Sequence, residues 1–247
     1  MEFLGEVLAW YAAPERWSGR DSLPALLGGH LGLTFASLAV ALAIALPLGL
    51  YIGHTGRAAQ LVVAVSNIGR AVPSLGWLGI VYPITTGLFA RSGHGFLPGL
   101  VALVALAIPP VVTNTYAGLR EVDADLQEAG RGMGMTEMQL LRRVEVPAAL
   151  PVILAGVRSA SVAVVATAPL MSIVGADTLG DYILAGLALG DQVAVFAAAV
   201  LVAALALLTE LGLGALQRRS VSPGIEGAER GVGGPAEGAP AQPAWPG

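Results

Sequence analysis

The side chains with the most specific pattern lie in a polar interval, residues 121–151, which interrupts an otherwise apolar sequence. Thr136 and Gln139 have the spacing of a capping box, in which each side chain accepts a hydrogen bond from the backbone of the other residue. A helix is therefore predicted to begin at Glu137. A helix capped in this way is a rigid projection on which another protein can dock, and we call residues 121–151 the polar loop.

Three glycines precede this helix and a proline follows it. Gly130, Gly132 and Gly134 permit a sharp turn between the helix and a preceding one, which is predicted to end near Glu128. Pro147 is predicted to help terminate the segment before the next apolar run.

The helix in the polar loop is predicted to have one apolar face and one basic face. The apolar face is Met138, Leu141 and Val144, and the basic face is Arg142 and Arg143. An ordinary interfacial loop of a membrane protein has the same periodicity, so this pattern alone leaves both interpretations open.

Catalytic chemistry has little support in this composition. The chain has no cysteine, which excludes disulfides, thiolate nucleophiles and cysteine-ligated metals. Its 13 basic residues are all arginines, so it cannot contain the phosphate-binding loop that uses lysine to reach nucleotide phosphates. His30, His54 and His94 are far apart in the sequence, and they predict interface residues rather than a metal site, which needs clustered ligands. Any ATP-hydrolysing motor must be another chain.

The composition is that of a multi-pass membrane protein. Hydrophobic residues make up 55% of the 247 residues and charged residues 12%, whereas soluble domains carry about 25% charged residues. The net charge of -4 is small and dispersed, so no nucleic-acid partner is expected. A helix needs about 20 apolar residues to cross the hydrocarbon core. The predicted spans, about five in an all-α fold, are residues 31–53, 70–91 with a possible start at 58, 95–119, 152–176 and 192–217.

Arginines indicate the orientation, because short cytoplasmic loops retain basic residues. With the polar loop inside the cell, eight arginines fall on or near the cytoplasmic side and three fall outside. This predicts an inner-membrane protein of a bacterial or archaeal cell, with its N-terminus outside and its C-terminus in the cytoplasm. Arg70 is treated separately: an arginine at the bilayer centre costs about 2.5–3.5 kcal/mol, so we expect it at the cytoplasmic end of the second span.

The sequence divides into three parts. Residues 1–27 are predicted to be an external or interfacial segment, either an amphipathic helix on the membrane surface or a partly ordered lead-in. Residues 28–219 form the transmembrane domain, which includes the polar loop. Residues 220–247 are dominated by Gly, Pro, Ala and Glu, and they are predicted to be a disordered cytoplasmic tail.

The polar loop resembles the cytoplasmic signature of the permease subunits of binding-protein-dependent ABC importers. That signature reads Glu-Ala-Ala, three residues, Gly, nine residues, then Ile-x-Leu-Pro, and the spacing here is the same. Glycine replaces the second alanine, and valines replace Ile and Leu. The positions that the resemblance assigns to coupling with an ATPase are Glu128, Ala129, Gly130, Gly134, Val144, Val146 and Pro147. The resemblance implies a type I importer permease fold, with no enzymatic activity and no cofactor of its own.

Further segments are similar to the osmoprotectant branch of this family, whose members import glycine betaine, choline, carnitine and related solutes. These segments are residues 67–75, 110–116, 150–158 and 175–181. As partners the resemblance implies cytoplasmic ATPase subunits, a second permease that is a copy or a homologue, and an external substrate-binding protein, in addition to membrane lipid. The aromatic residues of the spans suggest no compact cage for a quaternary ammonium, so substrate capture is expected in the binding protein.

The polar residues inside the spans are candidates for the translocation path, although such residues also hold membrane helices together. They are Asn67, Thr113, Asn114, Ser161 and Thr167. A permease for another small solute, such as an amino acid or a sulfonate, remains an alternative. An intramembrane enzyme would need a nucleophile and base or metal ligands that the spans do not offer. A scaffold protein would explain the hydrophobicity but not the registered loop.

Overall fold

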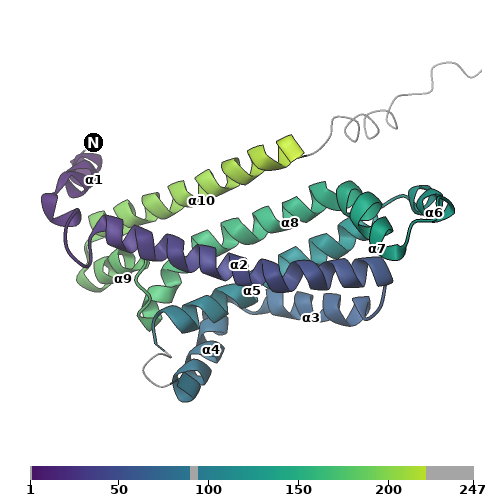
Figure 1. Cartoon of the computed structure of the whole chain (residues 1–247). Helices are drawn as coiled ribbons and strands as arrows, with labels where there is room; N and C mark the ends of the chain where they lie inside the picture. The colour runs from purple at the N-terminus through teal and green to yellow at the C-terminus, as the bar shows by residue number, and fades with distance from the viewer. Residues whose placement is uncertain (1, 90–93, 221–247) are drawn as a thin grey trace, which may run out of the picture.

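The computed structural model describes residues 2–89 and 94–220, and every regular element in them is helical (Figure 1). The predicted all-α class is therefore confirmed. Residues 221–247, where most of the predicted tail falls, lie outside the described residues.

Four long apolar helices can cross a membrane by length and composition within the part of the chain that the structure describes. They are α2 (Leu23–Thr55), α5 (Phe96–Arg120), the continuous stretch Glu137–Val174 that contains α8 (Val146–Thr167), and α10 (Gln192–Ser220). Each is long enough to cross the ~30 Å hydrocarbon core at 1.5 Å per residue. Predicted spans one and five fall within α2 and α10, and predicted spans three and four fall within the other two helices except for one or two residues at one end.

The second predicted span is not one straight helix. It consists of α3 (Ala59–Ala71) and α4 (Ser74–Phe89), which are bent by 99° relative to one another. The break has a local cause, because Pro73 disfavours helical geometry in the residue before it, and Val72 is extended with φ -73° and ψ 120°. If this bent pair counts as one span, the described residues contain five.

Helix α5 lies at the centre of the bundle, where it packs against α2 and α8. Small residues allow these helices to approach closely. A Cβ atom at Gly49 of α2 would lie 2.7 Å from Cβ of Thr115 in α5, and one at Gly156 of α8 would lie 2.6 Å from Cβ of Asn114. Gly49 and Gly156 are therefore packing positions.

The bundle has two distinct ends (Figure 1). At the first, which we call the loop end, α6 (Ala124–Gly132) and α7 (Glu137–Leu140) project beyond the long helices. At the second, which we call the N-terminal end, lie α1 (Glu2–Ala12), the short turn η1 (Pro14–Arg16) and α9 (Gly180–Leu189). The turn η4 (Ala168–Val174) continues α8 toward the N-terminal end.

The contact between α9 and η4 gives a first prediction. A Cβ atom at Gly180 would lie 1.9 Å from the Pro169 carbonyl oxygen, which is backbone and cannot rotate away. We expect Gly180→Ala to cost about 1–3 kcal/mol, which lowers the Tm by roughly 2–4 °C per kcal/mol. Gly212→Ala is the control, because that helical glycine has open space around it and alanine is the better helix former. Thermal unfolding of the purified variants in detergent measures both, and equal Tm values would contradict the packing argument.

Candidate functional site

The polar loop is a helical hairpin with a cap at each start. Helix α6 begins after Asp123, whose side chain accepts a hydrogen bond from the backbone N–H of Asp125 at 2.9 Å. Helix α7 begins at Glu137, and Thr136 and Gln139 form both hydrogen bonds of the capping box. The predicted start of this helix and its cap are confirmed.

The turn between α6 and α7 depends on Gly134. Its φ of +78° is a left-handed conformation that glycine adopts without steric cost, and its N–H donates to the Arg131 carbonyl at 2.9 Å. The expectation that all three glycines form the turn was wrong: Gly130 and Gly132 lie inside α6, which continues to Gly132 instead of ending near Glu128.

Gly130 has a packing role instead. A Cβ atom at this position would lie 2.7 Å from Cδ1 of Leu140, and the Leu140 side chain is fully buried. The absence of a side chain on α6 thus lets α7 lie directly against it. The expected apolar face was partly wrong, since Met138 is 54% exposed, whereas Leu140 is the buried anchor and Leu141 and Val144 are only partly buried.

A wide helical turn joins α7 to α8. Residues Leu141–Glu145 (η3) form a π-helix, and the N–H of Val146 donates to the Leu141 carbonyl five residues earlier. Pro147 then lies in the first turn of α8, where a missing N–H is tolerated. The expectation that Pro147 helps to terminate the segment was therefore wrong, because the helical stretch runs on from Glu137 to Val174.

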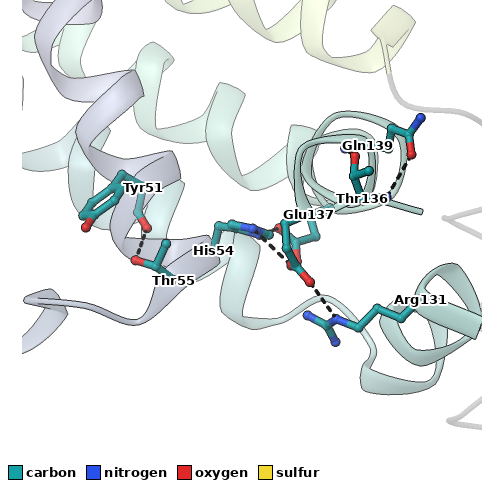
Figure 2. A network of polar contacts seen from close by, with 8 residues as sticks. Tyr51, His54, Thr55, Arg131, Thr136, Glu137 and Gln139 are labelled. Atoms are coloured by element: carbon teal, nitrogen blue, oxygen red, sulfur yellow. Dashed lines mark hydrogen bonds and ion pairs between the residues drawn. The ribbon is translucent and has the colours of Figure 1, made fainter. Parts of the chain in front are cut away.

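The π-turn directs a carboxylate toward the end of α2. Nδ1 of His54 lies 2.6 Å from Oε2 of Glu145, a side chain only 3% exposed, and Nε2 of His54 lies 3.4 Å from Oε2 of Glu137 (Figure 2). Oε1 of Glu137 also accepts a hydrogen bond from Nε of Arg131 at 3.4 Å. We call these four residues the His54 network; it connects α2, η3, α7 and α6.

The contacts of the His54 network hold the polar loop against the end of α2. A buried carboxylate is costly unless it is paired and hydrogen-bonded, and His54 supplies that partner to Glu145. Nδ1 and Nε2 of His54, in the last turn of α2, lie 2.6 and 3.4 Å from carboxylate oxygens of Glu145 and Glu137, so each ring nitrogen faces an acceptor. The end of α2 is thereby connected to the start of α7 through Glu137 and to the end of η3 through Glu145.

Reasoning from the sequence missed this network. His54 and Glu145 are 91 positions apart; His54 lies outside the recognised signature, and Glu145 occupies its unspecified position between Val144 and Val146. The available signals were a histidine at the end of a long apolar run and a single carboxylate between Val144 and Val146.

A cleft of about 760 Å³ opens between α2 and the polar loop. It is lined by residues of α2 such as Tyr51 and His54, by Arg57 of the following turn, and by Glu137 and Arg142 of the loop. Beyond it, Glu128, Ala129, Gly134 and Pro147 are exposed, Val144 and Val146 are partly buried, and Gly130 is buried. The exposed positions of the predicted signature are thus available to another chain.

The predicted path residues do not form one cluster of free polar groups. The side chains of Thr113, Asn114 and Ser161 donate to carbonyls of their own helices at 2.9, 2.7 and 2.8 Å. Thr167 ends α8 and is partly buried. Asn67 differs, because it is exposed on α3.

An aromatic cluster at the N-terminal end was also missed. The ring of Trp10 lies 5.3 Å from that of Tyr11 and 5.1 Å from that of Tyr182, in each case nearly perpendicular. The Arg16 guanidinium lies 4.7 Å from the Trp10 ring centre and 5.5 Å from that of Tyr182, so a cation of the chain already fills this corner. The cluster attaches α1 and η1 to α9 and α10.

Within residues 2–89 and 94–220 no group of three metal-ligating side chains is close enough to hold a metal ion. The described residues combine a bundle of apolar spans with a rigid, capped hairpin, which is the architecture of a multi-pass membrane protein. The family model of the binding-protein-dependent transport system inner membrane component matches residues 45–222, and the chain belongs to that family.

Curated relatives cover most of the chain. It is 38% identical over 202 residues to the carnitine transport permease protein OpuCB of Listeria monocytogenes, which covers 82% of this chain and 89% of that protein. It is 33% identical over 200 residues to the glycine betaine/carnitine/choline transport system permease protein OpuCB of Bacillus subtilis, with 81% and 89% covered. It is 38% identical to the osmoprotectant import permease protein OsmY of Salmonella typhimurium over 192 residues, with 77% and 78% covered.

Solved structures show the same fold. The inward-facing MetNI methionine ABC transporter contains a chain that superposes with a TM-score of 0.71 at 26% identity, covering 81% of this chain and 96% of that one. A second crystal form of MetNI gives a TM-score of 0.70 at 27% identity, with 78% and 94% covered. The expected type I ABC importer permease fold is confirmed.

Proposed function

We propose that this chain is the permease subunit of an ATP-driven importer for quaternary ammonium osmoprotectants such as glycine betaine, carnitine and choline. The observation that carries the proposal is the polar loop, whose capped hairpin exposes Glu128, Ala129 and Gly134 while the His54 network ties it to α2. The relatives named for these solutes, at 33–38% identity, support the substrate class.

In this proposal the polar loop docks on a cytoplasmic ATPase, and ATP hydrolysis takes place in that separate chain. Movement of the loop is passed directly to α8 through the continuous helix and to α2 through the His54 network. A second permease, either a copy or a homologue, completes the pore, and an external binding protein delivers the solute. The polar positions Asn67, Thr113, Asn114, Ser161 and Thr167 remain candidates for the path, and Asn67 is the one that is exposed in this chain.

Uptake in cells tests the proposal. The chain is expressed with its neighbouring ATPase and binding-protein genes in a strain without osmoprotectant transporters, and uptake of radiolabelled glycine betaine, carnitine and choline is measured. We expect saturable uptake of at least one of these solutes that disappears when the permease gene is omitted. Uptake of methionine but none of the three would favour the alternative of an amino-acid permease, which the MetNI likeness suggests.

Orientation is a separate prediction. We propose that the loop end faces the cytoplasm and the N-terminal end faces outward, because the arginines gather near the loop end. The chain has no cysteine, so single cysteines can be introduced at Glu15 of η1 and at Met133, which is 71% exposed. An impermeant thiol reagent is expected to label the Glu15→Cys variant in intact cells and the Met133→Cys variant only after lysis. The opposite pattern would invert the topology.

A further inference from the structure

Arg70 lies on the surface of the bundle, some distance along its length from the loop end. Helix α3 begins at Ala59, next to the loop end of α2, and Arg70 is eleven residues further on, which is about 17 Å along the helix axis. The hydrocarbon core is ~30 Å thick, so Arg70 is near its middle if α3 runs along the membrane normal beside α2. In that orientation Arg70 would not lie at the cytoplasmic end of the second span.

Helix α3 has two exposed stripes of side chains, one polar and one apolar. Gln60, Asn67 and Arg70 are all exposed, and their spacing of seven and three residues places them on one face. On the adjacent face Leu61, Val65 and Ile68 are 67%, 59% and 68% exposed. The apolar stripe suits lipid or a neighbouring helix, whereas the polar stripe needs water or a polar partner.

The helix break lies directly beside Arg70. Helix α3 ends at Ala71 and α4 starts at Ser74, with a 99° bend between them. Non-helical backbone at membrane depth is tolerated where it is buried in protein or lines a water-filled cavity, and broken helices of this kind form substrate sites in other transporters. The N-terminus of α4 adds a partial positive charge to that of the guanidinium.

The charge of Arg70 has no protein partner in the described part of the chain. Of the acidic residues in the spanning helices described, Glu145 and Glu137 contact His54, and Glu210 lies 3.4 Å from Arg158. A second copy of this chain would bring the same paired carboxylates. No free carboxylate of the described spans is therefore available to Arg70 from either copy.

We propose that Arg70 binds the carboxylate of a zwitterionic solute as it crosses the membrane. This inference rests on the proposed importer function and names the chemistry that one point of the path recognises. The planar guanidinium can hold a carboxylate through two parallel N–H···O bonds. Glycine betaine and carnitine carry such a carboxylate, whereas choline has a hydroxyl group and only a positive charge, which Arg70 repels.

The test compares solutes that share the trimethylammonium group and differ in the carboxylate. The complete transporter, with its ATPase and binding protein, is assayed for uptake of glycine betaine and choline as wild type and as Arg70→Gln, Arg70→Lys and Arg20→Gln. Arg20 is the matched control, an exposed arginine at the N-terminal end.

For Arg70→Gln we expect the maximal rate of glycine betaine uptake to fall on the order of tenfold or more, and the choline-to-betaine rate ratio to rise at least as much. Arg70→Lys is expected to retain more of the glycine betaine rate than Arg70→Gln, because lysine keeps the positive charge but cannot form the two parallel N–H···O bonds of a guanidinium.

The solute KM should change less than about twofold, since the external binding protein sets capture. A ratio in Arg70→Gln that stays within twofold of wild type, including an equal loss for both solutes, would overturn the inference. An equal loss with impaired assembly would instead indicate a carboxylate from a different partner permease. Failure of the wild-type complex to import either solute would count against the proposed function and not against Arg70 in particular.

Discussion

Glu145→Ala is expected to destabilise the protein by about 1–3 kcal/mol, because it removes a buried acceptor and leaves His54 without its closest hydrogen-bond partner. The matched control is Glu137→Ala, which removes the other carboxylate on the same imidazole. Glu137 is 63% exposed and lies 3.4 Å from His54, so its loss should cost less than about 1 kcal/mol.

Thermal unfolding of both variants, together with His54→Ala and the double variant His54→Ala/Glu145→Ala, separates the pair from other effects. A coupling energy above about 1 kcal/mol between His54 and Glu145 is expected from the double-mutant cycle. Equal costs for Glu145→Ala and Glu137→Ala, or additive effects in the cycle, would show that the His54 network does not hold the polar loop to α2.

Gly134→Pro is expected to uncouple ATP hydrolysis from uptake while the protein still reaches the membrane. Proline fixes φ near -65°, whereas Gly134 requires +78°, and proline also removes the N–H that donates to the Arg131 carbonyl. The strain of about 1–3 kcal/mol is confined to the exposed turn, so the spans should still assemble. We expect uptake to fall at least tenfold, on the order of the misplacement effects seen in other coupled sites.

Two control variants sharpen this prediction. Gly134→Asn should retain most uptake, because asparagine tolerates the left-handed conformation. Gly132→Ala should be neutral, since that glycine is inside α6 and has open space around it. Normal coupled uptake by a well-expressed Gly134→Pro variant would refute a role for the turn geometry.

Local features of the fold were predictable from the sequence where a short-range rule applied. The capping box at Thr136 and Gln139 and the left-handed glycine at 134 involve only neighbouring residues. The break at Val72–Pro73 obeys a local rule as well, yet the uncharged run to residue 91 favoured one span in a reading by hydropathy.

Long-range features were not predictable in the same way. The pairing of His54 with Glu145 depends on how α2 packs against α5 and α8, and on a π-turn that shifts the face of every later residue. The expected face of Met138, Leu141 and Val144 assumed a regular helix. Leu140 is instead buried against Gly130 of α6, and Glu145 is buried at the end of the wider turn. The depth of Arg70 likewise follows from where α3 begins, which hydropathy alone does not define.

Site-specific cross-linking of the polar loop shows directly whether this loop contacts the ATPase. A photoreactive amino acid is placed at Met138, which is 54% exposed on α7, and in a second variant at Leu189, which is 82% exposed at the end of α9. Both variants are co-expressed with the ATPase and the binding protein, and uptake is measured before irradiation. If the polar loop docks on the ATPase, we expect a covalent adduct with the ATPase from position 138 and none from position 189. An adduct with the ATPase from position 189 alone, or none from position 138 in a transporter that retains full uptake, would contradict it.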